Sequence, residues 1–449
     1  MANKDLGQFL EEAKEAGELL EASKEVDLYF GLSAVLEKLE KEKRFPSVLF
    51  NNVKGSDIPV VSNVFAERER VALAFGCDMK DINSWYRSRE DKIIDPVVVE
   101  EGPVQEVVMS GEDVDLYKLP IPTHNKKDAG PYITCGASVS RDPETGIRNI
   151  GIYRHQVHSK NKLGIHMSES SHILYIYSKY EAKGEDMPIA ITVGHHPAFY
   201  FGIMSFVPVG TDEYGIAGSM MGEALELVRC KTVPLEVPAY AEIVIEGFVS
   251  ATERKAEAPF GEFTTLYGGE HMYHVINVTA ITMRRKPVFL DCFSGHLDHQ
   301  LLGGIGRLSV IYKTIKMACP TVRDVHMPPS GCCRFICFVS IKKRMEGEAK
   351  NAIAAVLASD NFIKYAVIVD EDVDIFDDSA VIKAIALSLK ADQDGFMIRN
   401  AKGHALDPTA KDTFIITKVG IDATRPLKDF PETVSVPGSD DIDLNEFFN

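Results

Sequence analysis

The chain has 449 residues, 45% of them hydrophobic, and its 66 acidic and 49 basic side chains give a formal charge of −17. At roughly 150 residues per domain, this length predicts two or three domains with a sizeable core. The negative charge disfavours nucleic acid or an anionic membrane as the main partner, so a small anionic substrate would need a local basic pocket.

Signals for targeting and for disulfides are both missing. The chain does not begin with a basic segment followed by an apolar one, and no segment approaches the ~20 apolar residues of a membrane span. We therefore expect a cytoplasmic protein with no membrane span. The eight cysteines are scattered without CxxC pairs, which favours reduced thiols in the core.

The first segment, residues 1–103, has the pattern of a small α+β unit. Apolar side chains recur at helical spacing over residues 6–13 and again over 32–39. Strands are expected at 47–50 and 59–65, on either side of a polar turn.

From residue 104 to 302 the pattern changes to short apolar or alternating segments separated by Gly- and Pro-rich turns. This pattern is typical of an antiparallel β-barrel or sandwich with few helices. Strand-like segments lie at 104–109, 133–139, 189–193, 242–249 and 275–283.

A linker helix is expected within residues 303–325, and a third unit covers 326–449. There, strands at 334–341 and 365–369 alternate with helices at 346–358 and 379–389, which predicts a parallel or mixed sheet packed by helices. The acidic tail carries the apolar side chains Ile442, Leu444, Phe447 and Phe448, and we expect it to dock on a neighbour rather than to be disordered.

Several familiar motifs are missing from the chain. There is no GxGxxG after a strand, no GxxxxGK[ST], no GxSxG and no HExxH. Dehydrogenase, P-loop, serine-hydrolase and zincin functions therefore lose support.

The segment Glu257-Ala-Pro-Phe-Gly-Glu262 places two carboxylates at the ends of a turn. Pro259 restricts φ and Gly261 allows the chain to fold back, so the two acids can converge on one point. Such a pair suits proton transfer, because burial beside Phe260 would raise a carboxyl pKa and a nearby Arg would lower it. Taken alone, the segment is equally compatible with an exposed turn, which is the commoner case.

Further polar residues interrupt apolar surroundings in the middle unit. Asn149 and Arg154 lie five positions apart, which places them on opposite faces of a regular strand unless a bulge or bend intervenes. His172 and Glu226 each break an apolar segment. Either one could be a site residue, but a hydrogen-bonded core histidine and an exposed helix glutamate are the simpler interpretations.

Taken together, these segments resemble the UbiD-type decarboxylase family, which uses prenylated flavin mononucleotide (FMN). The resemblance covers nearly the whole chain and rests on the order and spacing of several motifs. They are Asn149-x4-Arg154, Ser170-x-His172-Ile, Leu225-Glu226-Leu-Val-Arg-Cys230, Val244-x-Glu-Gly-Phe248, Glu257–Glu262, Pro328-Pro-x-Gly-Cys332, Val369-Asp-Glu-Asp-Val373 and Lys418-Val-Gly-Ile-Asp-Ala-Thr424.

The resemblance implies an α+β fold: an N-terminal α+β segment, a split β-barrel that binds the flavin, and a C-terminal α/β oligomerisation domain. It implies that Asn149, His172 and Glu226 hold Mn²⁺ (or Mg²⁺) against the cofactor phosphate, a mixed oxygen and nitrogen set that suits these ions. A potassium ion is expected beside them, near the carbonyls of residues 218–221. Ile152, Ser171 and Lys418 are the further residues expected to contact the cofactor.

The resemblance also implies that Arg154, Glu257 and Glu262 form the catalytic network. Loss of CO₂ from an unsaturated or aromatic acid needs an electron sink, which no side chain provides and a cofactor must supply. The expected reaction is reversible, non-oxidative decarboxylation through a covalent prenylated-FMN adduct. Arg154 would bind a carboxylate and keep Glu257 ionised, and Glu262 would protonate the carbon.

Substrate and partners follow from the same resemblance. His296 is the expected substrate contact, and an aromatic or heteroaromatic acid is favoured, with a furan dicarboxylate as one candidate. The alternatives are a hydroxybenzoate-type decarboxylase and a non-catalytic flavin- and metal-binding subunit of a carboxylase complex. The expected partners are a flavin prenyltransferase and further copies of the chain in a homodimer or hexamer.

Overall fold

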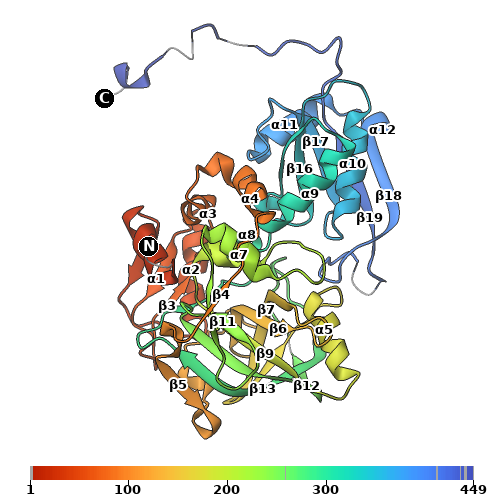
Figure 1. The fold of residues 1–449 in the computed structure, drawn as a ribbon. Helices are drawn as coiled ribbons and strands as arrows, with labels where there is room; N and C mark the ends of the chain where they lie inside the picture. The colour runs from red at the N-terminus through yellow and green to blue at the C-terminus, as the bar shows by residue number, and fades with distance from the viewer. Residues whose placement is uncertain (1–3, 258, 411–412, 435, 439–441, 448–449) are drawn as a thin grey trace.

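The computed structural model describes residues 4–257, 259–410, 413–434, 436–438 and 442–447. In Figure 1 the N-terminal segment and the barrel form the lower body, and the C-terminal unit stands above it. The predicted α+β fold is confirmed.

Among the N-terminal helices, α1 and α2 form where the apolar spacing predicts them, and α3 and α4 were not predicted. Asp5 caps α1 by accepting a hydrogen bond from the backbone N–H of Gln8, and the helix buries the expected apolar face. Their bounds are α1 Leu6–Glu15, α2 Gly31–Lys41, α3 Arg68–Phe75 and α4 Ile82–Glu90.

The N-terminal sheet has the order β1-β2-β3-β14 and takes its last strand from far along the chain. The strands are β1 Leu19–Ala22, β2 Ser47–Phe50, β3 Val60–Ser62 and β14 Phe289–Leu290. Because β14 pairs with β3, the residues that follow it, from Asp291 onward, are fixed between the N-terminal sheet and the barrel.

The middle unit is a closed barrel. Its strands follow the order β12-β9-β6-β7-β8-β13, and pairing between β12 and β13 closes the ring, with β5 added at an edge. The bounds are β5 Val107–Ser110, β6 Tyr132–Arg141, β7 Arg148–Ser159, β8 Lys162–Ile165, β9 Met187–Val193, β12 Ile243–Glu257 and β13 His271–Met283.

Short elements flank the barrel on the side of β7. A three-stranded sheet combines β4 Val97–Val99, β10 Glu226–Arg229 and β11 Glu236–Pro238. The helices are α5 His172–Glu181, α6 Pro197–Ile203 and α7 Glu213–Met221. A Cβ on Gly202 of α6 would lie 2.4 Å from the Cα of Ala217 in α7, so the close approach of these two helices requires a glycine.

The C-terminal unit is a mixed sheet in the order β15-β16-β17-β19-β18, packed by helices as predicted. Helices α8 Leu297–Leu302 and α9 Ile305–Ala318 lead into it from the barrel. Its elements are β15 Val322–His326, β16 Ile336–Ile341, α10 Glu348–Ser359, β17 Tyr365–Asp370, α11 Asp378–Ser388, α12 Ala391–Asp394, β18 Gly395–Lys402 and β19 Ile415–Asp422.

Helix α4 joins this unit to the rest of the molecule. The Asn83 side chain donates to Asp324 and to the carbonyl of Val325, and Arg87 forms an ion pair with Asp324. The C-terminal unit is therefore held at its base, beside the cavity described below.

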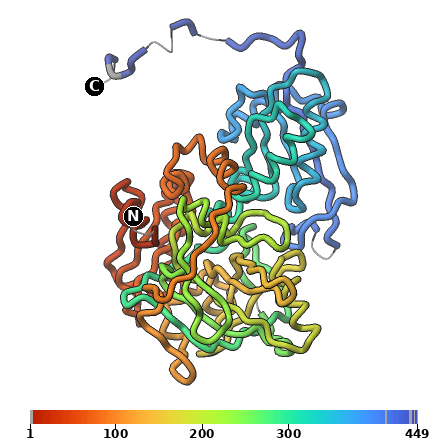
Figure 2. Tube along the Cα trace, viewed as in Figure 1, coloured from red at the N-terminus to blue at the C-terminus, as the bar shows by residue number. Residues whose placement is uncertain are grey.

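The end of the chain runs away from the C-terminal unit (Figure 2). The apolar side chains of Ile442, Leu444 and Phe447 are exposed in the single chain, and Phe448 lies outside the described residues. Docking of this tail on a neighbour stays a prediction. Within the described ranges, no helix is long and apolar enough to cross a membrane.

Candidate active site

A cavity of about 460 Å³ opens between the barrel and the C-terminal unit. Residues 149–154 of β7 line one side, with the start of α5 and of α7. The turn that follows β12 contributes Phe260, Glu262 and Phe263, and Arg307, Arg334 and Phe362 complete the opposite side. Among the predicted site residues, Asn149, Ile152, Arg154, Ser171, His172 and Glu262 all line this cavity.

Asn149 and Arg154 share the cavity although simple alternation would separate them. The β6–β7 pairing shifts register between Ile133 and Gly136, opposite the part of β7 next to Arg154. Such an irregularity interrupts the alternation of side chains between the two faces of a strand, so both side chains can reach the cavity.

One end of the cavity gathers an amide, an imidazole and a carboxylate. The side chain of Asn149 donates to Glu213 Oε1 at 2.9 Å, and His172 Nδ1 lies 3.9 Å from the same oxygen. Glu213 also accepts from the backbone N–H of Ile150 at 2.9 Å. Asn149 Oδ1 is buried and has no hydrogen-bond partner in the part of the chain that the structure describes.

These atoms fit a divalent cation. An unpartnered buried carbonyl oxygen costs free energy, and a cation bound there would remove that cost. An amide oxygen, a carboxylate and an imidazole match the preference of Mn²⁺ or Mg²⁺. Burial raises the pKa of Glu213, and the bonds from His172, Ile150 and Asn149 only partly oppose that shift.

The structure corrects the carboxylate of this set. Glu226 is the first residue of β10 and pairs with Val97 of β4 in the flanking sheet, and it does not line the cavity. It was expected on a helix, but it lies on a strand. Glu213, the first residue of α7, holds the place assigned to Glu226. Residues 218–221 lie at the far end of α7, where Gly222 N–H already bonds the Gly218 carbonyl, so the expected potassium ligands are not gathered with this set.

At the middle of the cavity, Arg154 joins both glutamates of the turn. Its Nε donates to Glu257 Oε1 at 2.6 Å, and its Nη1 donates to Glu262 Oε1. The guanidinium carbon lies 4.8 Å from the centre of the Phe260 ring, so the ring stacks beneath the charge. The turn is therefore buried, and the two acids converge on one cation.

The two carboxylates are not equivalent. Glu257 is 1% exposed, and its Oε2 has no hydrogen-bond partner. Burial raises the pKa of Glu257 above its ordinary value, and the charge of Arg154 offsets only part of that shift. The expectation that Arg154 keeps Glu257 ionised is therefore too simple, because desolvation is the larger effect.

Backbone contacts hold the turn against the barrel. Asp128 Oδ1 accepts from Gly261 N–H at 2.9 Å, and Glu262 N–H donates to the Leu266 carbonyl. A Cβ on Gly261 would lie 2.3 Å from Asn125 Nδ2, so the close approach of these two segments requires a glycine here. Ala258 lies outside the described residues.

The opposite side of the cavity is cationic. Arg307 forms an ion pair with Asp360, and its guanidinium stacks on Phe206 and Phe362. Arg334 is buried, and within the described residues its hydrogen bonds go to the carbonyls of Gln300 and Cys333 alone. Burial and the neighbouring charge of Arg307 lower the pKa of Arg334, but a guanidinium keeps its proton in proteins. Sequence reasoning missed both arginines.

Two predicted contacts lie away from the cavity. His296 Nδ1 lies 2.5 Å from Glu40 Oε2 of α2, and the ring stacks on Phe293. His299, one helical turn later, lines the cavity instead, and burial lowers its pKa to about 3, so it is neutral near neutral pH. Lys418 is buried in β19, where it donates to the carbonyls of Leu357 and Asp360.

Family models match almost the whole chain. The N-terminal domain of 3-octaprenyl-4-hydroxybenzoate carboxy-lyase matches residues 10–84, its Rift-related domain matches 96–297, and its C-terminal domain matches 300–423.

Curated relatives agree with this match. The chain is 35% identical over 416 residues to an anhydromevalonate phosphate decarboxylase of Methanothermobacter thermautotrophicus, covering 91% of this chain and 95% of that protein. The corresponding enzyme of Methanosarcina mazei is 34% identical, with 93% and 96% covered.

Solved structures agree as well. The UbiD-class enzyme HmfF from Pelotomaculum thermopropionicum, in complex with FMN, has a TM-score of 0.94 and 39% identity, covering 99% of this chain and all of that one. An evolved dimeric form of HmfF in complex with prFMN has a TM-score of 0.91 and 37% identity, with 99% and 100% covered. The 3,4-dihydroxybenzoic acid decarboxylase AroY of Klebsiella pneumoniae has a TM-score of 0.91 and 28% identity, again with 99% and 100% covered. The chain therefore belongs to the UbiD family of carboxy-lyases.

Proposed function

We propose that this protein catalyses the reversible, non-oxidative decarboxylation of an aromatic or heteroaromatic acid with prenylated FMN, and that the acid carries a second anionic group. Two features support the reaction. Arg154, Glu257 and Glu262 form one buried network, and Asn149, His172 and Glu213 provide a cation site in the same cavity.

The bound cofactor would supply the electron sink that loss of CO₂ requires. A divalent cation held by Asn149, His172 and Glu213 would bind the cofactor phosphate. Arg154 orients the carboxylate to be lost, and Glu262, which reaches the cavity, delivers a proton to the product carbon. Phe260 and Phe263 exclude water from the reacting atoms.

The proposed substrate class rests on the surroundings of Arg334. Among the described residues it forms no ion pair, although it is only 6% exposed and lines the cavity. A buried cation without a partner is costly, and a second carboxylate of the substrate would pair with it. This supports a dicarboxylate, with a furan dicarboxylate as the candidate.

Two related acids remain alternatives. A phosphorylated acid carries an anion that the same arginine would bind, and the curated relatives act on such a compound by their names. A hydroxybenzoate is the other alternative, because neutral His299 offers a hydrogen bond to a ring hydroxyl. A non-catalytic subunit is disfavoured because Arg154 and both glutamates are retained. Supply of the cofactor by a flavin prenyltransferase and assembly into a homodimer or hexamer belong to the same proposal. A potassium ion beside the divalent cation belongs to it as well, but with ligands other than the carbonyls of residues 218–221.

The test compares Arg334→Gln with wild type, both co-expressed with a flavin prenyltransferase. We expect kcat/KM for a ring dicarboxylate to fall about 10- to 100-fold, and kcat/KM for the matching monocarboxylate to change little, because one charged hydrogen-bond partner is lost. Arg323→Gln is the control, since Arg323 pairs with Glu371 on the surface of the C-terminal unit. Equal losses for both acids would contradict the second anionic group.

A further inference from the structure

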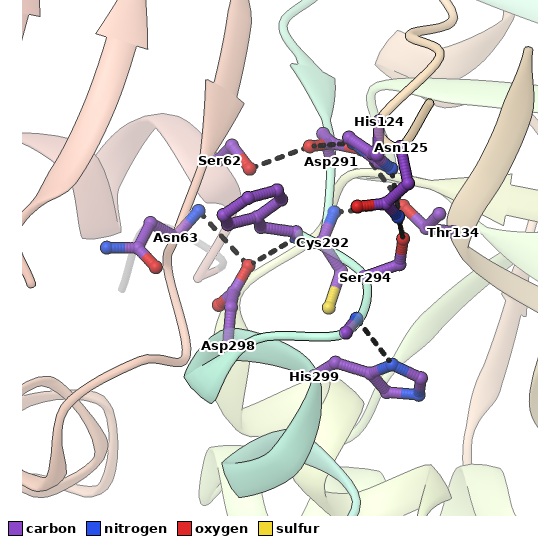
Figure 3. A network of polar contacts seen from close by, with 12 residues as sticks. Ser62, Asn63, His124, Asn125, Thr134, Asp291, Cys292, Ser294, Asp298 and His299 are labelled. Atoms are coloured by element: carbon purple, nitrogen blue, oxygen red, sulfur yellow. Dashed lines mark hydrogen bonds and ion pairs between the residues drawn. The ribbon is translucent and has the colours of Figure 1, made fainter. Parts of the chain in front are cut away.

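A buried chain of polar groups runs from the N-terminal sheet to the cavity (Figure 3). His124 Nε2 lies 3.0 Å from Asp291 Oδ2, and His124 Nδ1 lies 3.3 Å from the hydroxyl of Ser294. All three side chains are buried, and Ser294 lines the cavity. The catalytic network described above uses none of them.

Asp291 is held as a hydrogen-bond acceptor on several sides. Ser62 donates to its Oδ2 at 2.7 Å and Thr134 donates to its Oδ1 at 2.9 Å. With these hydroxyl groups in place, the remaining partner of the carboxylate is the Nε2–H of His124. The ring of His124 is therefore fixed in orientation, with Nδ1 toward Ser294.

Carboxylates surround His124. Asp291 is in contact, and the charges of Asp128, on the following loop, and Asp298, at the start of α8, also act on the ring. His299 of α8 is within electrostatic range but is neutral near neutral pH. Burial disfavours charge on the ring, but these negative charges outweigh it and raise the pKa of His124 above its ordinary value. In a protonated ring both nitrogens carry hydrogen, and Nδ1 donates to Ser294.

A second buried serine–histidine pair in the barrel provides a contrast. Ser138 Oγ lies 3.0 Å from His155 Nε2, and burial lowers the pKa of His155 to about 3, so that ring is neutral. The two pairs share their chemistry and burial and differ in the carboxylates around the ring. Ser138 does not line the cavity.

The direction of the Ser294 O–H bond depends on which neighbours donate to its oxygen. Beside a protonated His124 ring the oxygen accepts from Nδ1, and Asn125 Nδ2 donates to it at 3.4 Å. Within the described part of the chain, the hydroxyl has no protein acceptor other than the occupied Nδ1. Its O–H is left to point into the cavity.

We propose that Ser294 is a ligand-contacting residue whose hydroxyl donates a hydrogen bond to an acceptor oxygen in the cavity, and that His124 and Asp291 are positioning residues that fix the direction of this donor. The acceptor is a carbonyl oxygen of the flavin ring or a carboxylate oxygen of the acid. The proposal rests on the proposed function only for the identity of that ligand.

The same cluster supports the catalytic turn. Asn125 donates through its backbone N–H to Asp128 Oδ2 at 2.8 Å, and Asp128 Oδ1 accepts from Gly261 N–H, next to Glu262. One continuous set of bonds therefore orders both the Ser294 donor and the proton-carrying turn.

The first test is Ser294→Ala in the full chain, with Ser138→Ala as the matched control. FMN affinity is measured by fluorescence quenching, and KM and kcat are measured on the holoenzyme. A hydrogen bond to a charged or strongly polar acceptor predicts about a 10- to 100-fold loss in Ser294→Ala and little change in Ser138→Ala.

The two possible ligands, the flavin and the acid, are distinguished by whether FMN affinity or KM changes. Weaker FMN binding identifies the flavin carbonyl, and a higher KM with unchanged FMN affinity identifies the acid. Unchanged FMN affinity and unchanged KM in Ser294→Ala would overturn the proposal.

The second test is independent of turnover. In ¹⁵N-histidine-labelled protein, NMR should show both nitrogens of His124 protonated at about pH 7, while His155 shows one bare nitrogen. A neutral His124 there would overturn the positioning role. Because this measurement and FMN binding need no substrate, a chain that decarboxylates no acid would refute the proposed function and leave this result intact.

Discussion

Glu257 and Glu262 contact the same guanidinium, yet their surroundings differ. Glu257 is enclosed, with one oxygen lacking a partner, while Glu262 lines the cavity. We propose that Glu262, which reaches the cavity, delivers the proton, and that Glu257 holds the guanidinium of Arg154 in place.

The choice between Glu213 and Glu226 is testable by a matched pair of variants. Glu213→Gln should weaken Mn²⁺ binding in the presence of FMN by at least about 10- to 100-fold, the loss typical of removing even a group that only supports a metal ligand. Glu226→Gln should bind Mn²⁺ like wild type, because Glu226 lies in the flanking sheet. Titration followed by electron paramagnetic resonance measures both. Loss in Glu226→Gln with retention in Glu213→Gln would restore the assignment made from the sequence.

For single residues, the sequence predicts which types of side chain form the site better than it predicts which particular residues supply them. The Pro-Gly turn indicated that Glu257 and Glu262 could converge, and the family resemblance added Arg154. Glu213 was missed because acidic residues are common in the first turn of a helix, where the helix dipole stabilises them, so one more acid there does not indicate a site. His299 was missed in favour of His296 because only the rotation of α8 decides which of the two faces the cavity. Arg307 and Arg334 carry no local signal.

Elements were predicted wherever periodicity is local. Helices α1 and α2 and strand β2 lie where the pattern places them. Barrel closure through β12 and β13 and the addition of β14 to β3 depend on pairing between distant segments, which no local pattern encodes. The division at residues 103, 302 and 325 stays a prediction.

The packing of α6 on α7 gives a prediction at the element scale. Gly202→Ala would force a Cβ within 2.4 Å of Ala217 and separate the two helices. We expect the free energy of unfolding to fall by about 1–3 kcal/mol, as for other overpacked sites. Because Glu213 begins α7, Mn²⁺ binding should weaken as well.

The control is Gly7→Ala in α1, where a Cβ meets nothing closer than 3.4 Å. That change should leave stability the same or raise it by up to about 1 kcal/mol, because alanine favours helix. Urea unfolding measures both variants. Wild-type stability in Gly202→Ala would show that the contact between the helices is loose.

The whole molecule should lose stability in mild acid. Burial lowers the pKa of each member of a group of buried histidines to about 3, so below about pH 6.5 the unfolded chain binds protons that the folded chain does not. These histidines are His155, His195, His196, His299 and His326. The free energy of unfolding therefore falls as pH falls.

Groups with raised pKa values oppose this trend, among them Glu213, Glu257 and His124. Burial raises the pKa of Asp298 to about 6 and that of Glu242 to about 7, so the folded chain binds protons there. The pKa values of His158, His166, His274 and His404 are lowered as well, so the lowered histidines outnumber the raised groups. Each uncompensated histidine costs up to about 1.4 kcal/mol of stability per pH unit. Urea unfolding between about pH 7 and about pH 5 measures the net loss, and His195→Gln should reduce the slope. Stability that is constant or rises toward acid would contradict the burial of these histidines.

The most direct measurement compares Glu262→Gln with wild type after co-expression with a flavin prenyltransferase, following CO₂ release and deuterium incorporation from D₂O into the product of a ring dicarboxylate. Glu253→Gln, on the surface end of β12 in an ion pair with Lys162, is the control. We predict that Glu262→Gln keeps its flavin and loses about 10²- to 10⁴-fold in kcat, as expected when a general acid is removed, while Glu253→Gln turns over normally. Wild-type turnover and deuterium incorporation in Glu262→Gln would contradict the account of this cavity as a decarboxylase site served by that proton donor.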